Sequence, residues 1–450
     1  MNRTRMSSIV LLAVLAMLIQ SGARAETVLS LEGSGKNSAC YQAFVEKHPD
    51  VTVNTVSNIY YSTYDMISAF ITGEMCYDTF NMTSSSFDIK QLMRKGYCAP
   101  LSDSQVISEA LSRMYEPIHA MVTEDNQIYG VPFSCYIGYY TYCPEAWEAA
   151  GLSVDEVPST FGAYLDFLEQ WVERIRENPE YDISVCNAFD ETQYDAHSYV
   201  SYLVDRLIQE HIMQSSYAHE PLRFDTPEIR ELLDRCQRIG ADLYRYEPET
   251  KGNLALFEDL HGMRYLEYLV PLRITAEQPI LVQANLTVSF LNVRSTEKVL
   301  AKEYLECCAT CIAPEDAAYL YPDAQPVENE AFVMMLDSIR QMVTSLEMML
   351  TDETLTPEAR MKLEDRLAQK KEQMAEMERS EDRYFISPQD LERYHTYGCY
   401  LYFQAPSIFD PSTSDGENMK RLRDRFSYGN LPLDQFVVEL DRLAWMLEME

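Results

Sequence analysis

Residues Asp125 to Tyr142, DNQIYGVPFSCYIGYYTY, are the stretch on which the interpretation of the fold rests. A polar turn opens the stretch, Gly130 and Pro132 interrupt a short apolar run, and an aromatic, β-branched segment completes it. This pattern predicts a strand, a bend and a second strand. Glycine frees the backbone and proline fixes one φ, so the bend can be sharp yet defined. Such a bend suits a chain that crosses between two lobes.

Tyrosines dominate the second predicted strand. They stand at Tyr136, Tyr139, Tyr140 and Tyr142. Successive side chains of a strand point to opposite faces, so this spacing distributes the rings over both faces. At least one ring should then face a cleft, and we interpret the stretch as a hinge-side strand beside a ligand site.

Upstream of this stretch, short apolar strands alternate with helical patterns. The strands are expected at Thr27–Leu31, Val51–Val56 and Tyr77–Met82. Parallel strands need crossovers of this length, so the alternation predicts a parallel sheet with helices on its faces. Ligands of such sheets sit at the carboxyl ends of the strands. We therefore expect three loops to converge on one mouth, at residues 32–38, 58–63 and 83–87.

Helices dominate the chain after residue 143. Patterns at residues 144–150, 160–178 and 194–214 predict the helices of a second lobe, and residues 280–293 are rich in β-forming residues. The last helices are expected at residues 387–403, 418–428 and 432–447, each with one apolar face.

Residues 330–378 differ in composition, with Met and charged residues in place of aromatics. Apolar residues repeat at steps of four and three in two segments that flank residues 351–357. The predicted seam is Met335, Ile339, Met342, Leu346 and Met349 on one helix, and Leu363, Leu367, Lys370, Met374 and Met377 on the other. The spacing predicts an antiparallel helical hairpin that packs on a lobe, with a partner-binding arm as the alternative.

The first 25 residues have the features of a secretory signal peptide. Arg3 and Arg5 precede an apolar run, and small residues at Ala23 and Ala25 mark a cleavage site. We expect export to a periplasm or to the medium. The first cysteine, Cys40, lies well past the apolar run, so no lipoprotein cysteine is evident.

The composition is strongly acidic, with a formal net charge of −34 at pH 7. Nucleic acid and anionic membranes are poor partners for such a surface, whereas neutral or cationic solutes are compatible with it. The 11 cysteines are an odd number at irregular spacing, so at least one thiol stays unpaired. The CxxC at Cys308–Cys311 lies at a predicted helix end, and we favour small buried side chains there over a redox or metal motif.

Catalytic and metal-binding motifs are missing from the sequence. The GxGK at Gly33–Lys36 lacks the spacing of a phosphate-binding loop, and no two of the 7 histidines are spaced as a helical zinc pair. We expect no enzyme, no cofactor and no resident metal. Paired tyrosines can hold ferric iron. Tyr139 and Tyr140 should point apart in a strand, so only Tyr60–Tyr61 in a loop keeps that alternative open.

Several segments together resemble a known family in their order and spacing. They are Ala43–Val51, Gly73–Asp78, Gly96–Leu101, Ile128–Pro132, Glu145–Leu152 and Val157–Phe161, with weaker likeness at Phe224–Leu233, Ser289–Cys307 and Tyr428–Glu450. The chain resembles the family 1 extracellular solute-binding proteins, which hand sugars and related solutes to ABC importers.

The resemblance implies an α/β, two-lobe periplasmic-binding-protein fold with hinge crossings, a helix-rich C-terminal part and an inserted helical hairpin. We assign residues 1–25 to the signal peptide, 26–133 to the first lobe and 134–285 to the second lobe with its crossing strand. Residues 286–329 are expected to return to the lobes, 330–378 to form the hairpin and 379–450 to pack on the lobes.

The candidate ligand-binding residues combine aromatic rings with polar loop side chains, as sugar recognition requires. They are Ser34, Asn58, Tyr60, Tyr61, Asp78, Thr83, Ser84, Tyr136, Tyr139 and Tyr140. The three tryptophans lie on helical patterns, where core packing is the simpler role.

The leading hypothesis is an exported, monomeric binding protein that closes around a small solute, most simply a carbohydrate, and docks on ABC permease subunits. The alternatives are a secreted interaction protein that uses the same fold without transport, and a binding protein for a polyamine or ferric iron.

Overall fold

The computed structural model describes residues 27–33, 35–57, 63–178, 183–186, 196–246, 254–403 and 414–449 of the 450-residue chain. The predicted signal peptide lies outside these residues. Among the helices within them, none is both long and apolar enough to cross a bilayer.

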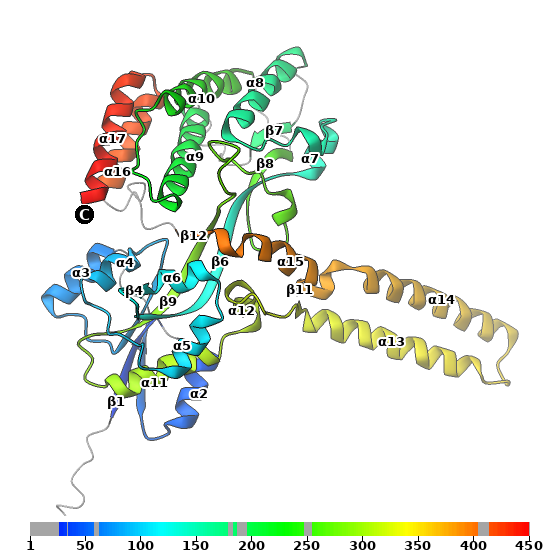
Figure 1. The fold of residues 1–450 in the computed structure, drawn as a ribbon. Coiled ribbons are helices and arrows are strands. Elements are labelled where there is room, and N and C mark those ends of the chain that lie inside the picture. The colour runs from blue at the N-terminus through cyan, green and yellow to red at the C-terminus, as the bar shows by residue number, and fades with distance from the viewer. Residues whose placement is uncertain are drawn as a thin grey trace, which may run out of the picture.

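A sheet of eight strands runs through the whole molecule (Figure 1). Its order is β2-β1-β3-β9-β6-β8-β7, and β12 adds to β9. The strands are β1 (Val28–Glu32), β2 (Thr52–Val56), β3 (Thr79–Thr83), β6 (Gly130–Tyr142), β7 (Ile183–Cys186), β8 (Leu254–His261), β9 (Val282–Leu291) and β12 (Leu401–Phe403). Pairing is parallel between β1 and its neighbours, as the βα pattern predicted, but antiparallel at the centre where β9 and β6 lie.

Two separate hydrophobic cores form around the two ends of this sheet. The first core contains side chains from β1, β3, the first part of β6 and the whole length of β9. It also contains side chains from the helices α2 (Ala39–Lys47), α3 (Thr63–Thr72), α4 (Ile89–Arg94), α5 (Gln105–Ser112), α6 (Glu116–Met121), α11 (Lys298–Thr310), α12 (Pro314–Leu320) and α15 (Pro388–Tyr397). It forms the lower body in Figure 1, which we call the first lobe.

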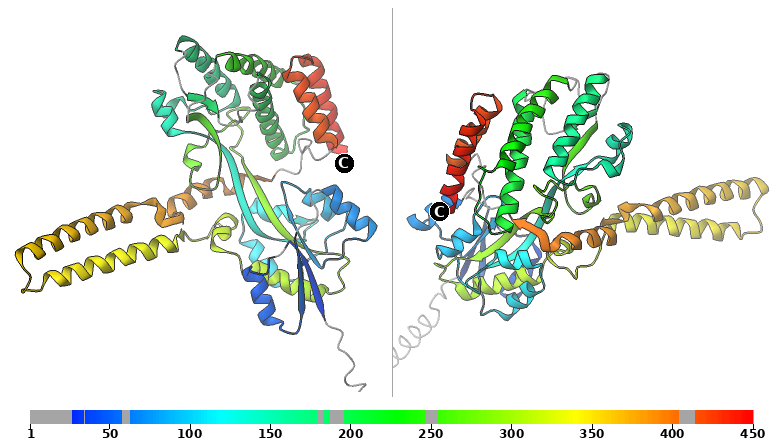
Figure 2. Two further views of the ribbon diagram at one scale, coloured as in Figure 1. Left: turned by 180° about the vertical axis from the view of Figure 1, so that it is seen from behind. Right: turned by 45° about the horizontal axis from the view of Figure 1, so that its top comes forward.

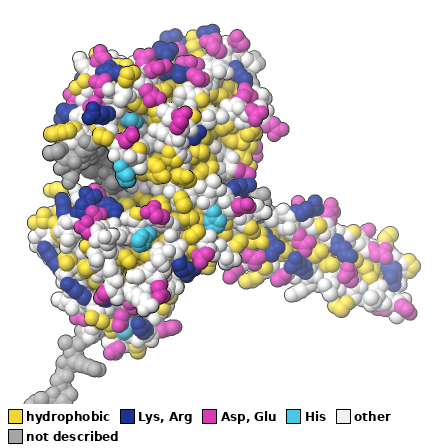
Figure 3. Space-filling view, in the orientation of Figure 1, with side chains coloured by type: hydrophobic (Ala, Val, Ile, Leu, Met, Phe, Trp, Pro, Cys, Tyr) yellow, Lys and Arg dark blue, Asp and Glu magenta, His cyan; other side chains and the backbone are white. Residues whose placement is uncertain are grey.

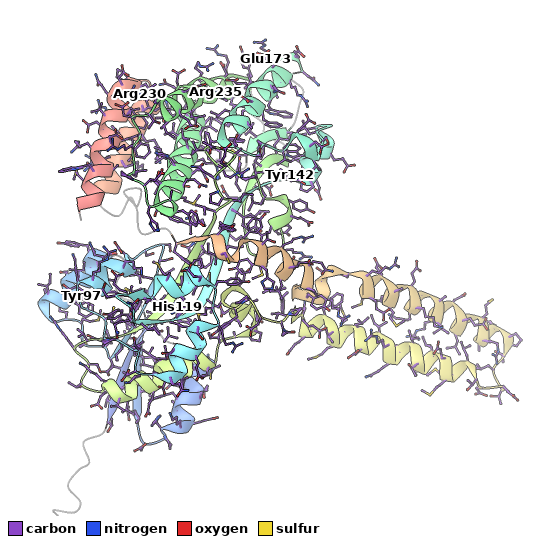
Figure 4. All side chains as sticks on the ribbon, viewed as in Figure 1. Tyr97, His119, Tyr142, Glu173, Arg230 and Arg235 are labelled. Atoms are coloured by element: carbon purple, nitrogen blue, oxygen red, sulfur yellow. The ribbon has the colours of Figure 1, made fainter. Side chains whose placement is uncertain are left out.

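The second core forms the upper body, or second lobe. It contains side chains from β7, β8, the end of β6, and the helices α7 (Pro144–Ala149), α8 (Phe161–Glu177), α9 (Ala196–Tyr217), α10 (Pro227–Tyr246), α16 (Ser414–Ser427) and α17 (Leu433–Met449). Figure 4 labels Tyr97 and His119 in the lower body and Tyr142 and Arg235 in the upper one. The two cores share no buried residue among those described.

Strands β6 and β9 connect the lobes. They pair antiparallel from Gly130 to Gly138, and at Gly138 the partner of β6 changes from Gln283 of β9 to His261 of β8. Tyr139 belongs to the first core and Tyr140 to the second. The change from one core to the other therefore falls between two adjacent tyrosines that point to opposite faces, as predicted for a strand.

The interruption predicted at Gly130 and Pro132 is milder than a bend between two strands: β5 (Gln127–Ile128) ends at Ile128, and β6 carries a register shift after Pro132. The polar turn at Asp125–Asn126 does form, with positive φ at both residues, between β4 (Thr123–Glu124) and β5. Strand β6 begins at Gly130 and runs on through Pro132. A Cβ on Gly130 would lie 2.5 Å from Val288 Cγ1, so glycine is needed there for close packing and not for a bend.

The helical hairpin predicted at residues 330–378 is present, but the prediction that it packs on a lobe is wrong, since its two helices form a small core of their own (Figure 1). Helices α13 (Glu330–Leu350) and α14 (Pro357–Arg379) form an arm that projects away from both lobes (Figures 1 and 2). The short strands β10 (Val327–Glu328) and β11 (Tyr384–Ile386) pair at its base, next to a 3-10 turn at Glu381–Arg383.

The predicted seam of α13 is partly wrong. Ile339 and Leu346 are buried as predicted, but Leu336 and Val343 fill the seam in place of Met335 and Met342. Met335 keeps 51% of its surface exposed, whereas Leu336 keeps 2%. Both sets repeat at steps of four and three, so the period alone could not choose between neighbouring apolar residues.

The C-terminal segment also differs from prediction. The helix expected at residues 387–403 ends at Tyr397, and a 3-10 turn at Gly398–Tyr400 leads into β12. Strand β12 pairs in parallel with the start of β9. Further 3-10 turns stand at Val154–Glu156 and Leu266–Tyr268.

Substitution Gly130→Ala should destabilise the protein by about 1–3 kcal/mol, because the new Cβ would clash with Val288 and Phe290 across the β6–β9 pair. The matched control is Gly35→Ala, where nothing lies within 4 Å of the added Cβ and the cost should stay below about 0.5 kcal/mol. Urea unfolding of both variants measures the difference. Equal stability of the two variants would contradict the close packing of β6 on β9.

Candidate functional site

One face of β9 is buried and the other is polar. Val282, Ala284, Leu286 and Val288 are fully buried in the first core. Between them stand Gln283, Asn285 and Thr287, which remain partly exposed. An alternation of this kind places the polar side chains together on the opposite face of the sheet.

Neighbouring strands extend this polar face. Tyr136 lies opposite Asn285, and Tyr402 of β12 lies opposite Gln283. Directly opposed residues share a face, so these two rings stand beside the amides of β9. We call Tyr136, Gln283, Asn285, Thr287 and Tyr402 the polar sheet face. Tyr136 is 43% exposed, so its ring is available to a ligand.

A pocket of about 370 Å³ lies at the upper end of this face. Gly138 and Gln283 line it on the sheet side. Its other lining side chains include Arg206, Gln209, Glu210, Asp259, His261 and Arg273. Glycine at position 138 leaves room for the His261 ring, because a Cβ there would lie 2.9 Å from His261 Nδ1.

Arg206 organises one wall of the pocket. Its guanidinium lies 3.9 Å from the centre of the Tyr140 ring and 4.6 Å from that of Tyr202, and it forms an ion pair with Asp259. Phe257 stacks on Tyr140 at 5.3 Å, and the Tyr140 hydroxyl lies 2.9 Å from that of Tyr164. Arg206 and Phe257 therefore both pack against the Tyr140 ring, and the geometry supports a structural role for this predicted ligand residue.

Glu210 is a buried acid in the wall of the pocket. Burial raises its pKa to about 7, and Gln214 Nε2 donates a hydrogen bond to its Oε1 at 2.8 Å and partly offsets this effect. The positive charge of Arg273 also lowers the pKa. The carboxyl therefore changes charge near neutral pH.

Two tyrosines that the sequence did not single out lie between the lobes. Tyr217 stands at the end of α9 in the second lobe, and Tyr400 stands just before β12, with 6.3 Å between their ring centres. They keep 43% and 38% of their surface exposed. Figure 3 shows a recess between the two lobes in the orientation of Figure 1. Tyr400 lay within a predicted helix, so no sequence signal placed it near β9.

The predicted site residues fall into two groups. Ser34, Asn58, Tyr60 and Tyr61 lie outside the described residues. The other predicted residues, Asp78, Thr83, Ser84, Tyr136, Tyr139 and Tyr140, are described. Tyr139 and Tyr140 are among the residues that line the pocket of about 370 Å³, whereas the other four are not.

Asp78 and Ser84 have internal partners. The Asp78 carboxylate accepts hydrogen bonds from Ser30 N at 2.8 Å and from Ser295 Oγ at 2.6 Å. Ser84 is fully buried, and its Oγ accepts from Leu286 N at 3.0 Å. These contacts support structural roles in joining β1, β3 and β9.

Thr83 and Tyr139 differ in their access to the polar sheet face. Thr83 pairs with Thr287, and their hydroxyl oxygens lie 3.2 Å apart, so Thr83 extends that face towards the first lobe. Tyr139 points the other way into the first core, where its hydroxyl donates to the Gly262 carbonyl at 2.6 Å.

No cluster of three or more His, Cys, Asp or Glu side chains with metal-binding geometry occurs within the described ranges. The CxxC cysteines lie at the end of α11, with Cys308 buried and Cys311 half-buried. The polar sheet face offers aromatic surface, amides and a hydroxyl, and the pocket at its upper end adds the charged side chains of Arg206, Asp259 and Arg273.

Comparison with known proteins identifies the fold. No protein-family model matches the sequence, and no curated protein matches it. Among solved structures, a cyclic α-maltosyl-1,6-maltose binding protein from Arthrobacter globiformis superposes with a TM-score of 0.53 at 12% identity, over 93% of this chain and 98% of that chain.

Two further structures give the same result. An ABC substrate-binding protein from Listeria monocytogenes in complex with cycloalternan gives a TM-score of 0.50 at 13% identity, over 93% of this chain and 98% of that chain. A family 1 extracellular solute-binding protein from Bifidobacterium longum subsp. infantis gives 0.50 at 12% identity, over 94% and 99%. The predicted two-lobe solute-binding fold is confirmed.

Replacement of Glu210 by Gln should remove a pH-dependent loss of stability. Burial raises the pKa of Glu210 in the folded state, so the folded protein holds this proton up to a higher pH than the unfolded chain does. The contribution of Glu210 to stability is therefore greatest below pH 4.5, and it is lost as the pH rises from 4.5 through about 7. Glu210→Gln should match the wild type at pH 4.5 and exceed it at pH 8 by up to about 3 kcal/mol in urea unfolding. Parallel pH profiles of the two proteins would contradict this. Glu231→Gln, an exposed change on α10, is the control and should leave the profile unchanged.

Proposed function

We propose that this protein captures a small solute, most simply a carbohydrate, on the polar sheet face between its lobes. One observation carries the proposal. Strands β6 and β9 run side by side from one lobe towards the other, and they present a polar, partly exposed face between the two cores. A solute bound there would contact both lobes.

The chemistry of this face suits a sugar. Sugars present flat C–H surfaces that pack on aromatic rings, and hydroxyls that need hydrogen-bonding partners in place of water. Tyr136 offers an exposed ring, and Gln283, Asn285 and Thr287 offer amides and a hydroxyl on the same face. We propose that Tyr217 and Tyr400, whose rings approach each other from the two lobes, line the same recess.

Charge also favours a neutral or cationic solute. The chain carries a net charge of −34, and Arg206 in the pocket is already paired with Asp259. A free anion would therefore meet an unfavourable field. Many sugars are uncharged and avoid this cost.

Binding is proposed to close the lobes. A ligand shifts an equilibrium between open and closed forms only if it binds one form better, and contacts with both lobes supply that difference. The loops that carry Ser34, Asn58, Tyr60 and Tyr61 follow β1 and β2 in the sequence, and we keep these residues as proposed ligand contacts from the first lobe.

We propose further that the mature protein is exported as a monomer and hands its solute to ABC permease subunits. The neighbours of similar fold support the transport role, since one is described as an ABC substrate-binding protein and another as a binding protein for a cyclic maltose derivative. A non-enzymatic role fits the same neighbours.

A second candidate function rests on the arm. Helix α13 exposes Met334, Met335, Met342, Met348 and Met349 along a projection that leaves both lobes (Figure 2). Exposed methionines are adaptable contact surfaces, so this feature favours a protein partner in place of, or beside, a permease.

Thermal melts with linear and cyclic oligosaccharides test sugar capture. A sugar at 100 times its Kd should stabilise the protein by about 2.7 kcal/mol. Tyr136→Ala should weaken binding by about 1–3 kcal/mol with an unchanged melting temperature in the absence of sugar, because the ring is exposed. Tyr244→Ala, an equally exposed tyrosine on α10, is the matched control and should bind normally. Equal affinity in both variants would remove Tyr136 from the site.

Removal of the arm separates the two candidate functions. Replacing residues 330–379 by a short Gly/Ser linker should preserve folding, because β10 and β11 pair at the base and Asn329 N donates to Arg383 O at 2.8 Å. Sugar binding measured by calorimetry should be unchanged. Loss of sugar binding in a folded arm-less protein would show that the arm belongs to the binding machinery.

A further inference from the structure

Helices α2 and α11 pack face to face in the first lobe, and their contacts follow a regular register. Phe44 of α2 meets Tyr304 of α11 edge to face, with ring centres 5.7 Å apart. One turn further along α2, His48 Nε2 lies 2.7 Å from Glu303 Oε2. Higher residue numbers on α2 thus meet lower numbers on α11, so the two helices run antiparallel.

The same register brings two cysteines together. Cys40 precedes Phe44 by four residues, and Cys308 follows Tyr304 by four, so each occupies the next turn on the contacting face. Cys40 Sγ lies 3.7 Å from the Tyr304 hydroxyl. Cys40 and Cys308 shift each other's pKa, and Tyr304 lowers the pKa of both, as expected for side chains that lie side by side. The two thiols and the phenol therefore form one small cluster.

The two thiols have different environments. Cys40 is only half-buried, lies in the first turn of α2 after the N-cap Ser38, and has its sulfur 3.3 Å from Ser38 Oγ. Hydrogen bonds from Cys308, then from Ser38 and Tyr304, lower the pKa of Cys40 to about 6 although burial opposes them. Cys308 is buried, and its pKa is raised well above its ordinary value. An accessible thiolate beside a buried thiol is the arrangement of an attacking and a resolving cysteine.

We propose that Cys40 and Cys308 are a thiol pair that closes into a disulfide by exchange with a low-molecular-weight or protein disulfide. The Cys40 thiolate attacks one sulfur of the oxidant, forms a mixed disulfide and releases the other sulfur as a thiolate. Cys308 then loses its proton, attacks Cys40 Sγ and displaces the remaining half of the oxidant as a second thiolate. The two cysteines are oxidised, and the oxidant disulfide is reduced to two thiols.

Six of the other cysteines in the described part of the chain differ from this pair. Cys98, Cys135 and Cys236 are buried, and burial raises the pKa of each. Cys76 and Cys399 are exposed. Cys307 neighbours Cys308 on α11, and burial raises its pKa too, so it is the nearest competitor as a resolving residue.

Closure of the pair would fasten the start of α2 to α11. Since Cys40 and Cys308 are far apart in the sequence, their linkage would strongly restrict the unfolded chain. The loop at residues 33–38, which carries the proposed ligand contact Ser34, leads directly into this helix. Oxidation is therefore expected to raise the melting temperature by several degrees.

Oxidised glutathione at pH 7, applied to the mature full-length protein, tests the proposal. The wild type should lose two free thiols, and peptide mass spectrometry should find Cys40 linked to Cys308. The thiol of Cys40 should react with iodoacetamide with a midpoint near pH 6. A persistent glutathione adduct on Cys40, a link to Cys307, or no loss of thiols in the wild type would each overturn the pair.

Variants separate the two steps. Cys308→Ser should stop at the glutathione adduct on Cys40, and Cys40→Ser should abolish formation of the pair and the rise in melting temperature. Cys76→Ser, which removes an exposed thiol, is the control and should oxidise as the wild type does. Should Cys308→Ser fail to fold, Cys308→Ala serves the same step, and the linked peptide in the wild type remains decisive.

Discussion

The antiparallel pairing of β6 with β9 is the constraint on which the rest of the structure depends. It places Ile137 beside Ala284 in the first core and Tyr136 beside Asn285 on the open face. Since side chains alternate along a strand, the burial of one set fixes the exposure of the other. A shift of the β6–β9 register by one residue would bury the polar side chains and expose the core. The register that buries the first core therefore also places the polar side chains at the candidate site.

Sequence periodicity predicted the elements better than it predicted their contacts. The strand at residues 280–293, the βα repeats and the hairpin follow from local patterns, and the structure has them. Gly130 was interpreted through its backbone freedom, but the structure needs glycine there because Val288 and Phe290 approach so closely. This close approach comes from a partner strand about 160 residues further along the chain, so no local sequence pattern contains it. The burial of Leu336 in place of Met335 in the arm has the same cause, because contacts with the other helix decide which of two neighbouring apolar residues is buried.

In the candidate site too, the sequence indicated which residues share a strand face but not which residues they contact. Alternation in β9 marks Gln283, Asn285 and Thr287 as one face, which the sequence alone could have indicated. Asp78 and Ser84 looked like loop polar groups, but they satisfy backbone and hydroxyl donors of neighbouring strands. Tyr140 looked like a platform, but Arg206 and Phe257 pack against its ring. Buried polar side chains generally have such internal partners, and only the tertiary structure reveals which they are.

The division into two cores has a mechanical consequence for ligand capture. Interdigitated cores resist deformation, whereas a few strands can bend where their partners change. Gly138 is such a place, since it pairs with β9 on one side and with β8 on the other. The two cores share no buried side chain among the described residues, and we propose that the second lobe rotates about this point when a solute binds. Tyr136 lies two residues before Gly138 on the same strand. A solute stacked on the Tyr136 ring would therefore lie next to the point where we expect the strand to bend.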